Sequence, residues 1–117
     1  MATVTVLFEV TIKEGHMDHY LAMAASLKEE LAKAEGFLAS ERFQSLSQPN
    51  KLLSKSEWRD EESVRRWRTA AAHRVCQQAG READFEDYRI TVVTPLRTYT
   101  LTGRDEAPAD SNTFFGV

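Results

Sequence analysis

The stretch TVTVLFEVTI, residues 3–12, determines how the fold begins. Its apolar side chains recur at every second position: Val4, Val6, Phe8, Val10 and Ile12. A period of two with many β-branched residues is typical of a β-strand that buries one face. The other face still carries Leu7, so we expect this strand to need some cover on its second side as well.

A helix and a hairpin are predicted to follow this strand. Over residues 17–35 the apolar positions recur at helical intervals: Tyr20, Ala24, Leu27, Leu31 and Ala34. Gly36 comes next, where a helix commonly ends. Residues 37–46 and 52–58 then read as two strands, and the turn-forming residues 47–50 between them indicate a hairpin.

The second half of the chain repeats the helix–strand order. Asp60 is placed to cap a helix whose buried stripe is predicted to be Val64, Trp67, Ala71 and Val75. Gly80 is the expected end of that helix. A long last strand is predicted over residues 88–101, and Pro95 within it requires an edge position or a bulge. Residues 102–117 are expected to form a loosely ordered tail.

The order β-α-β-β-α-β predicts an α+β protein with a ferredoxin-like sandwich. In that fold two helices cover one face of a four-stranded antiparallel sheet, and we assign residues 1–101 to this single domain. The second face of the sheet then lacks cover. Two copies that pack these faces together would solve the problem, so a homodimer is expected.

Composition and charge exclude several classes of protein. Hydrophobic residues make up 42% of the 117 residues, which is enough for one core. A net charge of -3 argues against nucleic-acid binding, and no apolar run is long enough to span a membrane. No signal-peptide pattern is present, and the single cysteine, Cys76, excludes an internal disulfide. We therefore expect a cytoplasmic protein in which Cys76 has no catalytic role.

Several motifs point to a known family. They are Gly36-Phe37-Leu38, Trp58-Arg59-Asp60-Glu61-Glu62, Val64-Arg65-Arg66-Trp67-Arg68, Ala72-His73-Arg74, and Gly80-Arg81 followed by Asp87-Tyr88-Arg89-Ile90. Over residues 3–101 the chain resembles the antibiotic biosynthesis monooxygenase (ABM) family. The resemblance implies a dimeric α+β barrel built from ferredoxin-like protomers. The family includes cofactor-free monooxygenases of aromatic compounds, quinol oxygenases and haem-degrading enzymes.

Haem degradation is not expected from the resemblance. In that branch an Asn on the first strand, a Trp on the second helix and a His ten residues later form the site. Here these positions hold Phe8, Trp67 and Gln77, so the Asn and the axial His ligand are missing. The chain also lacks the Gly-x-Gly-x-x-Gly and P-loop motifs of nucleotide sites. No cofactor is therefore expected.

The aromatic-oxidising branch supplies the first candidate site residues. There an Asn precedes a Trp by four residues on the third strand, and a His lies on the second strand. Here the Trp is Trp58, while Ser54 and Gln44 occupy the other two positions and can still form hydrogen bonds. Strand alternation places Ser56 on the same face as Ser54, beside Gln44 or Phe43. Whether these serines line a pocket or face solvent stays open.

Aromatic side chains are the candidate walls of such a pocket. We name Trp58, Trp67, Phe8 and Phe43 as substrate-binding residues, with Trp58 expected to contribute more than Trp67. A large aromatic residue at helical spacing is more often part of a core, and that alternative applies to both tryptophans.

Three histidines carry candidate acid–base or metal chemistry. His73 is the most plausible catalytic base, although a helix-end histidine that bonds only to the backbone is the more common case. His16 and His19 have a spacing seen in metal sites. With Asp18 as the one evident carboxylate nearby, we interpret them as exposed helix-end residues and predict no metal site.

Four arginines lie on or beside the second predicted helix: Arg65, Arg66, Arg68 and Arg74. They could steer an acidic or phenolate substrate. The favoured interpretation is a solvated helix face whose arginines pair with Glu61 and Glu62.

The function predicted is a cofactor-independent monooxygenase that uses O₂ on a small hydroxylated aromatic or quinol. His73, Ser54 and Gln44 are its candidate catalytic residues. The alternative is a non-catalytic protein that binds a small molecule in the same fold.

Overall fold

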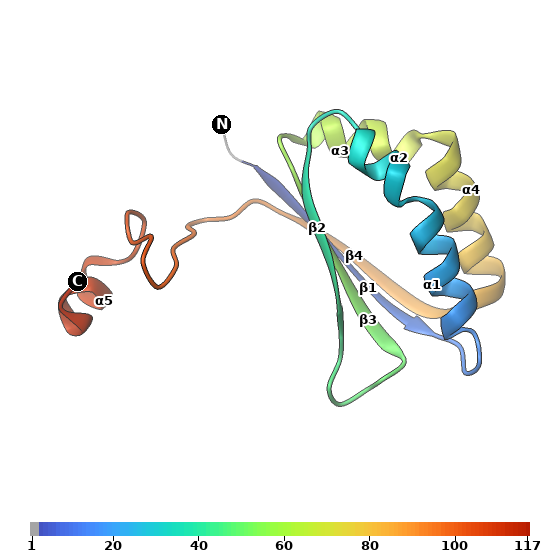
Figure 1. The fold of residues 1–117 in the computed structure, drawn as a ribbon, viewed down its shortest axis with the longest axis horizontal. Helices are drawn as coiled ribbons and strands as arrows, with labels where there is room; N and C mark the ends of the chain where they lie inside the picture. Colours follow the sequence, from blue (N-terminus) through green and yellow to red (C-terminus); the bar gives the residue numbers. More distant parts are fainter. Residues whose placement is uncertain (1–2) are drawn as a thin grey trace.

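The protein is a four-stranded antiparallel sheet with all helices of the domain on one face (Figure 1). The computed structural model describes residues 3–117, except the side chains of residues 71 and 72. The strands are β1 (Val4–Ile12), β2 (Phe37–Gln44), β3 (Lys51–Trp58) and β4 (Phe85–Val93), in the spatial order β2-β3-β1-β4. This confirms the predicted α+β, ferredoxin-like fold.

The register of the strands places two rows of side chains under the helices. One row runs across the sheet through Arg42, Ser54, Phe8 and Ile90. The neighbouring row runs through Ser40, Ser56, Val6 and Val92. Serines therefore occupy the middle of the covered face, where a sheet usually carries Val or Ile.

Each of the two predicted helices is in fact a pair of helices. The first pair is α1 (Met17–Ser26) and α2 (Lys28–Lys33), and the second is α3 (Glu61–Thr69) and α4 (Ala71–Ala79). At Leu27 the helix tightens, because the peptide N–H bonds to the carbonyl three residues back. At Ala70 the backbone is extended, with φ -63° and ψ 137°, which ends α3 outright. An apolar stripe continues through such breaks, so its period does not reveal them.

The restart after Ala70 changes which residues of α4 face the sheet. Val75, predicted to be buried, is 67% exposed, whereas His73, Cys76 and Gln77 are partly buried. The predicted packing of Ala71 lies outside the described side chains.

Gly80 does not end the second helical pair as predicted. The chain continues through a five-residue π-helical turn, Gly80–Asp84, which leads directly into β4. Gly80 has a right-handed φ of -61°, and a Cβ there would overlap the ring of Phe85. The lack of a side chain at Gly80 therefore lets the ring of Phe85 approach the backbone closely. Gly80 does not serve as a helix cap.

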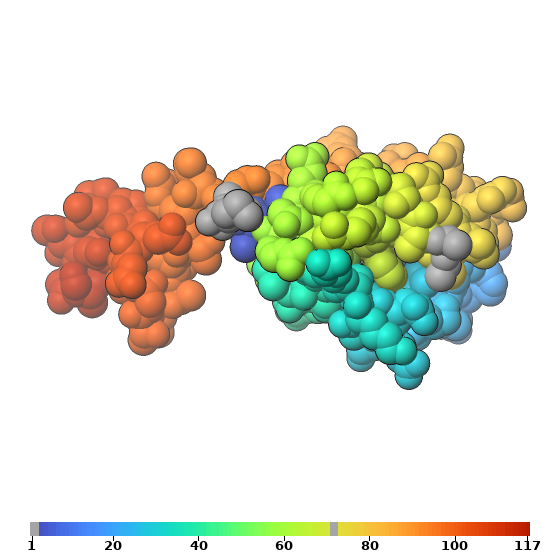
Figure 2. All heavy atoms as spheres, turned by 90° about the horizontal axis from the view of Figure 1, so that it is seen from above, coloured from blue at the N-terminus to red at the C-terminus, as the bar shows by residue number. Residues whose placement is uncertain are grey.

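The last strand is shifted from its prediction. β4 begins at Phe85 and ends at Val93, so Pro95 lies beyond the strand and imposes no bulge on it. Residues after β4 lead away from the sheet and contain a short helix, α5 (Ala109–Phe115), which was not predicted (Figures 1 and 2). None of the helices in residues 3–117 has the length and apolar character needed to cross a membrane.

The hydrophobic core is divided into two clusters. One contains the buried residues Val10, Ile12, Tyr20 and Leu52. The other contains Val4, Trp58 and Val64. The serine rows lie between the two clusters along the sheet. Small polar side chains at this level leave unfilled volume under the helices.

The backbone at Gly36 lies closely against a neighbouring side chain. It has a φ of +84°, and a Cβ there would overlap the side chain of Ser63 on α3. Its carbonyl accepts a 2.7 Å hydrogen bond from the N–H of Arg59. This contact closes the corner at which β2, β3 and α3 meet.

We predict that Gly36→Ala destabilises the protein more than Gly15→Ala does. Both glycines have a positive φ, which costs an alanine about 1–2 kcal/mol, but Gly15 has no atom near its would-be Cβ. Gly36→Ala should lose about 1–3 kcal/mol more through the overlap with Ser63. Chemical denaturation of both variants measures the difference; equal losses would contradict the role given to this contact.

Candidate active site

A cavity of about 240 Å³ lies between the sheet and the helices, where the core is divided. All four strands contribute to its wall, and so do α1, α3 and α4. Most of the lining is apolar or aromatic, with a small number of polar groups, which is the usual make-up of a small-molecule site.

Five of the seven predicted site residues line this cavity: Phe8, Ser54, Trp58, Trp67 and His73. Gln44 and Phe43 do not. The Gln44 amide donates a 2.8 Å hydrogen bond to the carbonyl of Pro49 in the β2–β3 turn. Phe43 pairs with Leu53 on the face of the sheet that has no helices. Neither residue is carried into the proposed function.

The two serines of β3 face the cavity rather than solvent, and they differ in their bonding. Ser56 Oγ accepts a 2.9 Å hydrogen bond from Trp58 Nε1, so it is engaged in holding the indole. In the described part of the chain no protein group bonds to the hydroxyl of Ser54. Ser54 is therefore the serine that can offer a hydrogen bond to a ligand.

The two tryptophans both line the cavity but differ in burial. Trp58 is 1% exposed and belongs to the core, where its ring lies edge-on to Phe37 at 5.4 Å between centroids. Trp67 is partly buried, and its ring centroid lies 5.2 Å from that of His73. The flat side of a ligand would therefore meet Trp67 beside the histidine, with Trp58 behind it.

His73 lies on the wall of the cavity, and its pKa is lowered. Burial lowers the pKa of its imidazole below the ordinary value, the Arg74 charge lowers it further, and a hydrogen bond to the backbone opposes both. That bond joins Nδ1 to the carbonyl of Arg68 at 3.4 Å. A carbonyl only accepts, so Nδ1 is the donor in this contact, and among the described residues no hydrogen bond to Nε2 is found.

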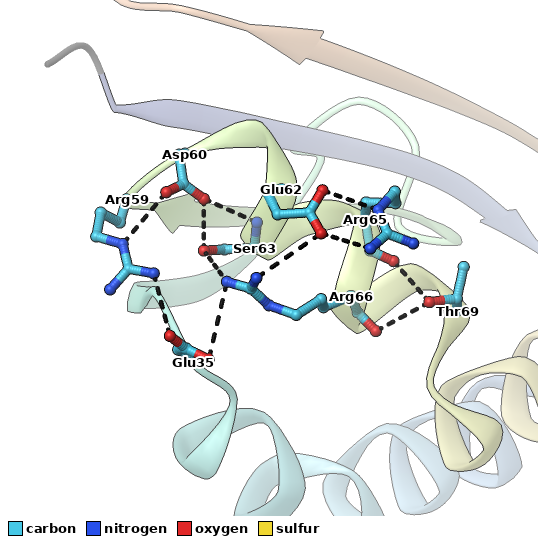
Figure 3. A network of polar contacts seen from close by, with 8 residues as sticks. All are labelled: Glu35, Arg59, Asp60, Glu62, Ser63, Arg65, Arg66 and Thr69. Atoms are coloured by element: carbon cyan, nitrogen blue, oxygen red, sulfur yellow. Dashed lines mark hydrogen bonds and ion pairs between the residues drawn. The ribbon is translucent and has the colours of Figure 1, made fainter.

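A network of hydrogen bonds and ion pairs links Glu35, Arg59 and Asp60 to the residues of α3 (Figure 3). Asp60 caps α3 by accepting hydrogen bonds from the N–H and hydroxyl of Ser63 at 2.8 and 2.6 Å. These two bonds lower the pKa of Asp60 to about 2. Glu35, from the loop before β2, pairs with Arg59 at 3.5 Å and with Arg66 at 3.9 Å. The network therefore joins the first helical pair to the second.

The four arginines predicted as a solvated face divide into two kinds. Arg65 and Arg66 pair with Glu62, as favoured from the sequence, although Glu61 takes no part in the ion pairs of the described residues. Arg68 instead lines the cavity.

Several lining residues were not predicted from the sequence to be site residues: Tyr20, Ser40, Arg42, Cys76 and Gln77. Arg42 is the most consequential, because its guanidinium lies 5.9 Å from the centre of the Tyr20 ring. Burial raises the pKa of Tyr20, and the Arg42 charge opposes that shift. The alternation of β2 places Arg42 on the covered face of the sheet. An arginine on an edge strand is nevertheless usually interpreted as a solvent-facing residue.

The two histidines near the start of α1 have exposed side chains, as predicted, but they share a carboxylate partner that was not predicted. His16 and His19 each place Nδ1 within 3.1 Å of Asp84, a fully buried carboxylate 65 or more residues later in the chain. Across the described residues, no three potential ligands are arranged to hold a metal ion. The cluster ties the start of α1 to the π-helical turn.

We predict that Trp58→Phe destabilises the protein by about 1–3 kcal/mol, because it leaves a void and removes the hydrogen-bond partner of Ser56. Trp67→Phe should cost clearly less, since that ring is only partly buried. Urea unfolding of the two variants provides the comparison. A larger loss for Trp67→Phe would reverse the assignment of core and cavity wall.

Known proteins are similar to this chain in sequence and in fold. The chain is 46% identical over 87 residues to the jasmonate monooxygenase ABM of Pyricularia oryzae; the match covers 74% of this chain and 40% of that protein. The fold is similar to that of SnoaB, a cofactor-independent oxygenase from Streptomyces nogalater, with a TM-score of 0.73 and 18% identity over 82% of this chain and 95% of that one. A conserved protein from Methanosarcina mazei gives a TM-score of 0.74 and 22% identity over 80% of this chain and 92% of that one.

The family model that matches describes antibiotic biosynthesis monooxygenases, and it aligns with residues 3–79. This range includes β1, the hairpin and both helical pairs, and with them most of the cavity wall. The chain belongs to the antibiotic biosynthesis monooxygenase (ABM) family.

Proposed function

We propose that the cavity is the active site of a cofactor-independent monooxygenase that acts with O₂ on a small hydroxylated aromatic or quinol. The observation that carries the proposal is His73, an imidazole with a lowered pKa on the wall of a largely apolar cavity, with no hydrogen bond to Nε2 among the described residues. Membership of the ABM family supplies the reaction class. The oxygenase SnoaB, which shares the fold, works without a cofactor.

In the proposed reaction His73 Nε2 takes the proton of the substrate hydroxyl. The resulting anion is electron-rich and transfers one electron to O₂. The substrate radical and superoxide then combine at a ring carbon that bears hydrogen, and the peroxide anion takes the proton back from His73. Loss of water from the resulting hydroperoxide, with the hydrogen of that carbon, leaves a carbonyl group. One oxygen atom enters the substrate, the other leaves as water, and the substrate supplies all the electrons.

The cavity supports this chemistry by its polarity. Apolar walls weaken the solvation of a substrate anion, so the anion is a stronger reductant than it is in water. Trp67 and Phe8 provide aromatic faces for a planar ring. Ser54, whose hydroxyl is free of protein partners in the described residues, can orient a substrate oxygen.

The substrates tested should extend beyond aromatics. The relative from Pyricularia oryzae is named for jasmonate, an organic anion, and this chain spans only 40% of its length. The alternative function, a non-catalytic binding protein, uses the same cavity but has no need of a base at residue 73.

We also propose a homodimer formed through the face of the sheet that has no helices. This face carries partly exposed apolar side chains, Leu7, Phe43 and Leu53, among the charges of Glu9 and Lys51. A second copy placed on this face would cover them.

The test of the enzyme is oxygen uptake by the purified protein with a panel of hydroquinones, hydroxynaphthalenes and jasmonate, with no flavin or metal added. His73→Ala should slow oxygen uptake by about 10²- to 10⁴-fold while substrate affinity changes little, as expected for loss of a general base. His19→Ala, which lies outside the cavity, is the matched control and should keep the rate.

The pH profile gives a second readout for the same base. Because the pKa of His73 is lowered, its neutral form prevails above the ordinary histidine value of about 6.5. The rate should therefore not fall until the pH drops below that value. Unchanged uptake in His73→Ala would contradict the role of His73 as the base, and no uptake with any compound would favour the binding protein.

The dimer is tested by light scattering, which should give about twice the chain mass of 13.3 kDa. Leu7→Asp should split the dimer, because a buried unpaired charge costs several kcal/mol. Leu46→Asp, in the exposed β2–β3 turn, should leave the mass unchanged. A monomeric wild-type protein at micromolar concentration would contradict the proposed interface.

A further inference from the structure

The charges around the cavity are all of one sign. Two arginines, Arg42 and Arg68, are among its lining residues, and none of those residues is an aspartate or a glutamate. An apolar cavity with cationic groups and no anionic group on its wall favours an anionic ligand.

These two arginines also differ from their neighbours in how they are paired. Arg59, Arg65 and Arg66 each lie within ion-pair distance of a carboxylate at the corner of the fold (Figure 3). Within the described residues, neither Arg42 nor Arg68 has such a partner. Their charge is therefore available to a ligand.

Arg42 is the better placed of the two. It lies on the covered face of β2, directly across from Ser54, and its guanidinium is near the face of the buried Tyr20 ring. The Arg42 side chain is exposed, and its planar guanidinium can bind a carboxylate through two parallel hydrogen bonds. Ser40 and Ser54 add hydroxyl groups at the same part of the wall.

We infer that the substrate carries a carboxylate in addition to its reacting hydroxyl, and that Arg42 binds this carboxylate. The inference rests on the proposed function for the identity of the cavity as a substrate site. Arg42 and His73 belong to different elements, β2 and α4, so one molecule can be held at its acidic end by Arg42 and present its hydroxyl group to His73. Arg42 is then a specificity-determining residue.

Matched acid and ester pairs test the inference by calorimetry. The probes are 4-hydroxybenzoate, 4-hydroxycinnamate and 6-hydroxy-2-naphthoate, each compared with its methyl ester, which keeps the ring and the hydroxyl group but removes the charge. The wild-type protein should bind at least one acid about 10- to 100-fold more tightly than its ester, as expected for a charge-assisted bidentate contact.

Arg42→Gln should bring the affinity for that acid down to that of the ester and leave the ester affinity unchanged. Arg42→Lys should recover part of the preference, since it restores the charge but not the planar fork. Arg65→Gln is the matched control, because this arginine is paired with Glu62 outside the cavity lining, and it should keep the full preference.

The inference is overturned if no acid is preferred over its ester, or if Arg42→Gln weakens acid and ester alike. Circular dichroism of each variant shows whether a loss comes from unfolding. Oxygen uptake separates the two proposals. A binding preference for the acid that depends on Arg42, without oxygen uptake, overturns the proposed oxygenase activity. Equal oxygen uptake with acid and ester overturns the inferred carboxylate on the substrate.

Discussion

The contact between Gly36 and Ser63 is the constraint on which the rest of the structure depends. It brings the backbone before β2 against the first turn of α3, at the point where β3 ends in Trp58. Asp60 fixes Ser63 from the other side, and Glu35 links the loop to the arginines of α3. With this corner closed, the second helical pair is held above the sheet and forms the roof of the cavity.

The cavity itself is the result of an interruption in the core. Two apolar clusters stabilise the two ends of the domain, while Ser54 and Ser56 occupy the centre of the covered face. Filling these positions with Val or Ile would stabilise the protein and close the site. Burial in the same part of the molecule lowers the pKa of His73.

The arginines around the cavity form two groups that differ in their ion pairing. Arg59, Arg65 and Arg66 pair with glutamates at the corner of the fold, whereas Arg42 and Arg68 line the cavity. Arg66 and Arg68 are only two residues apart on α3, yet one belongs to each class. A helix turns by about 200° over two residues, so neighbours in the sequence point to different partners.

The sequence alone determined the order of the elements and the family. The alternation of β1, the hairpin and the cap at Asp60 are local patterns, and each is decided by residues within one strand or turn. They suffice for the ferredoxin-like fold because few arrangements satisfy that order of strands and helices. Ser54, Trp58, Trp67 and His73 were also named from the sequence, through their positions in family motifs.

Only the tertiary structure decided how side chains from distant elements meet. Asp84 joins His16 and His19 across more than sixty residues, and Arg42 reaches Tyr20 from another element. The break at Ala70 turned Val75 outward, and the register of β2 left Gln44 and Phe43 outside the cavity. A hydrophobic pattern specifies which face of an element is buried, but not which residues of other elements lie against that face, because this depends on register, helix breaks and packing across the whole sheet.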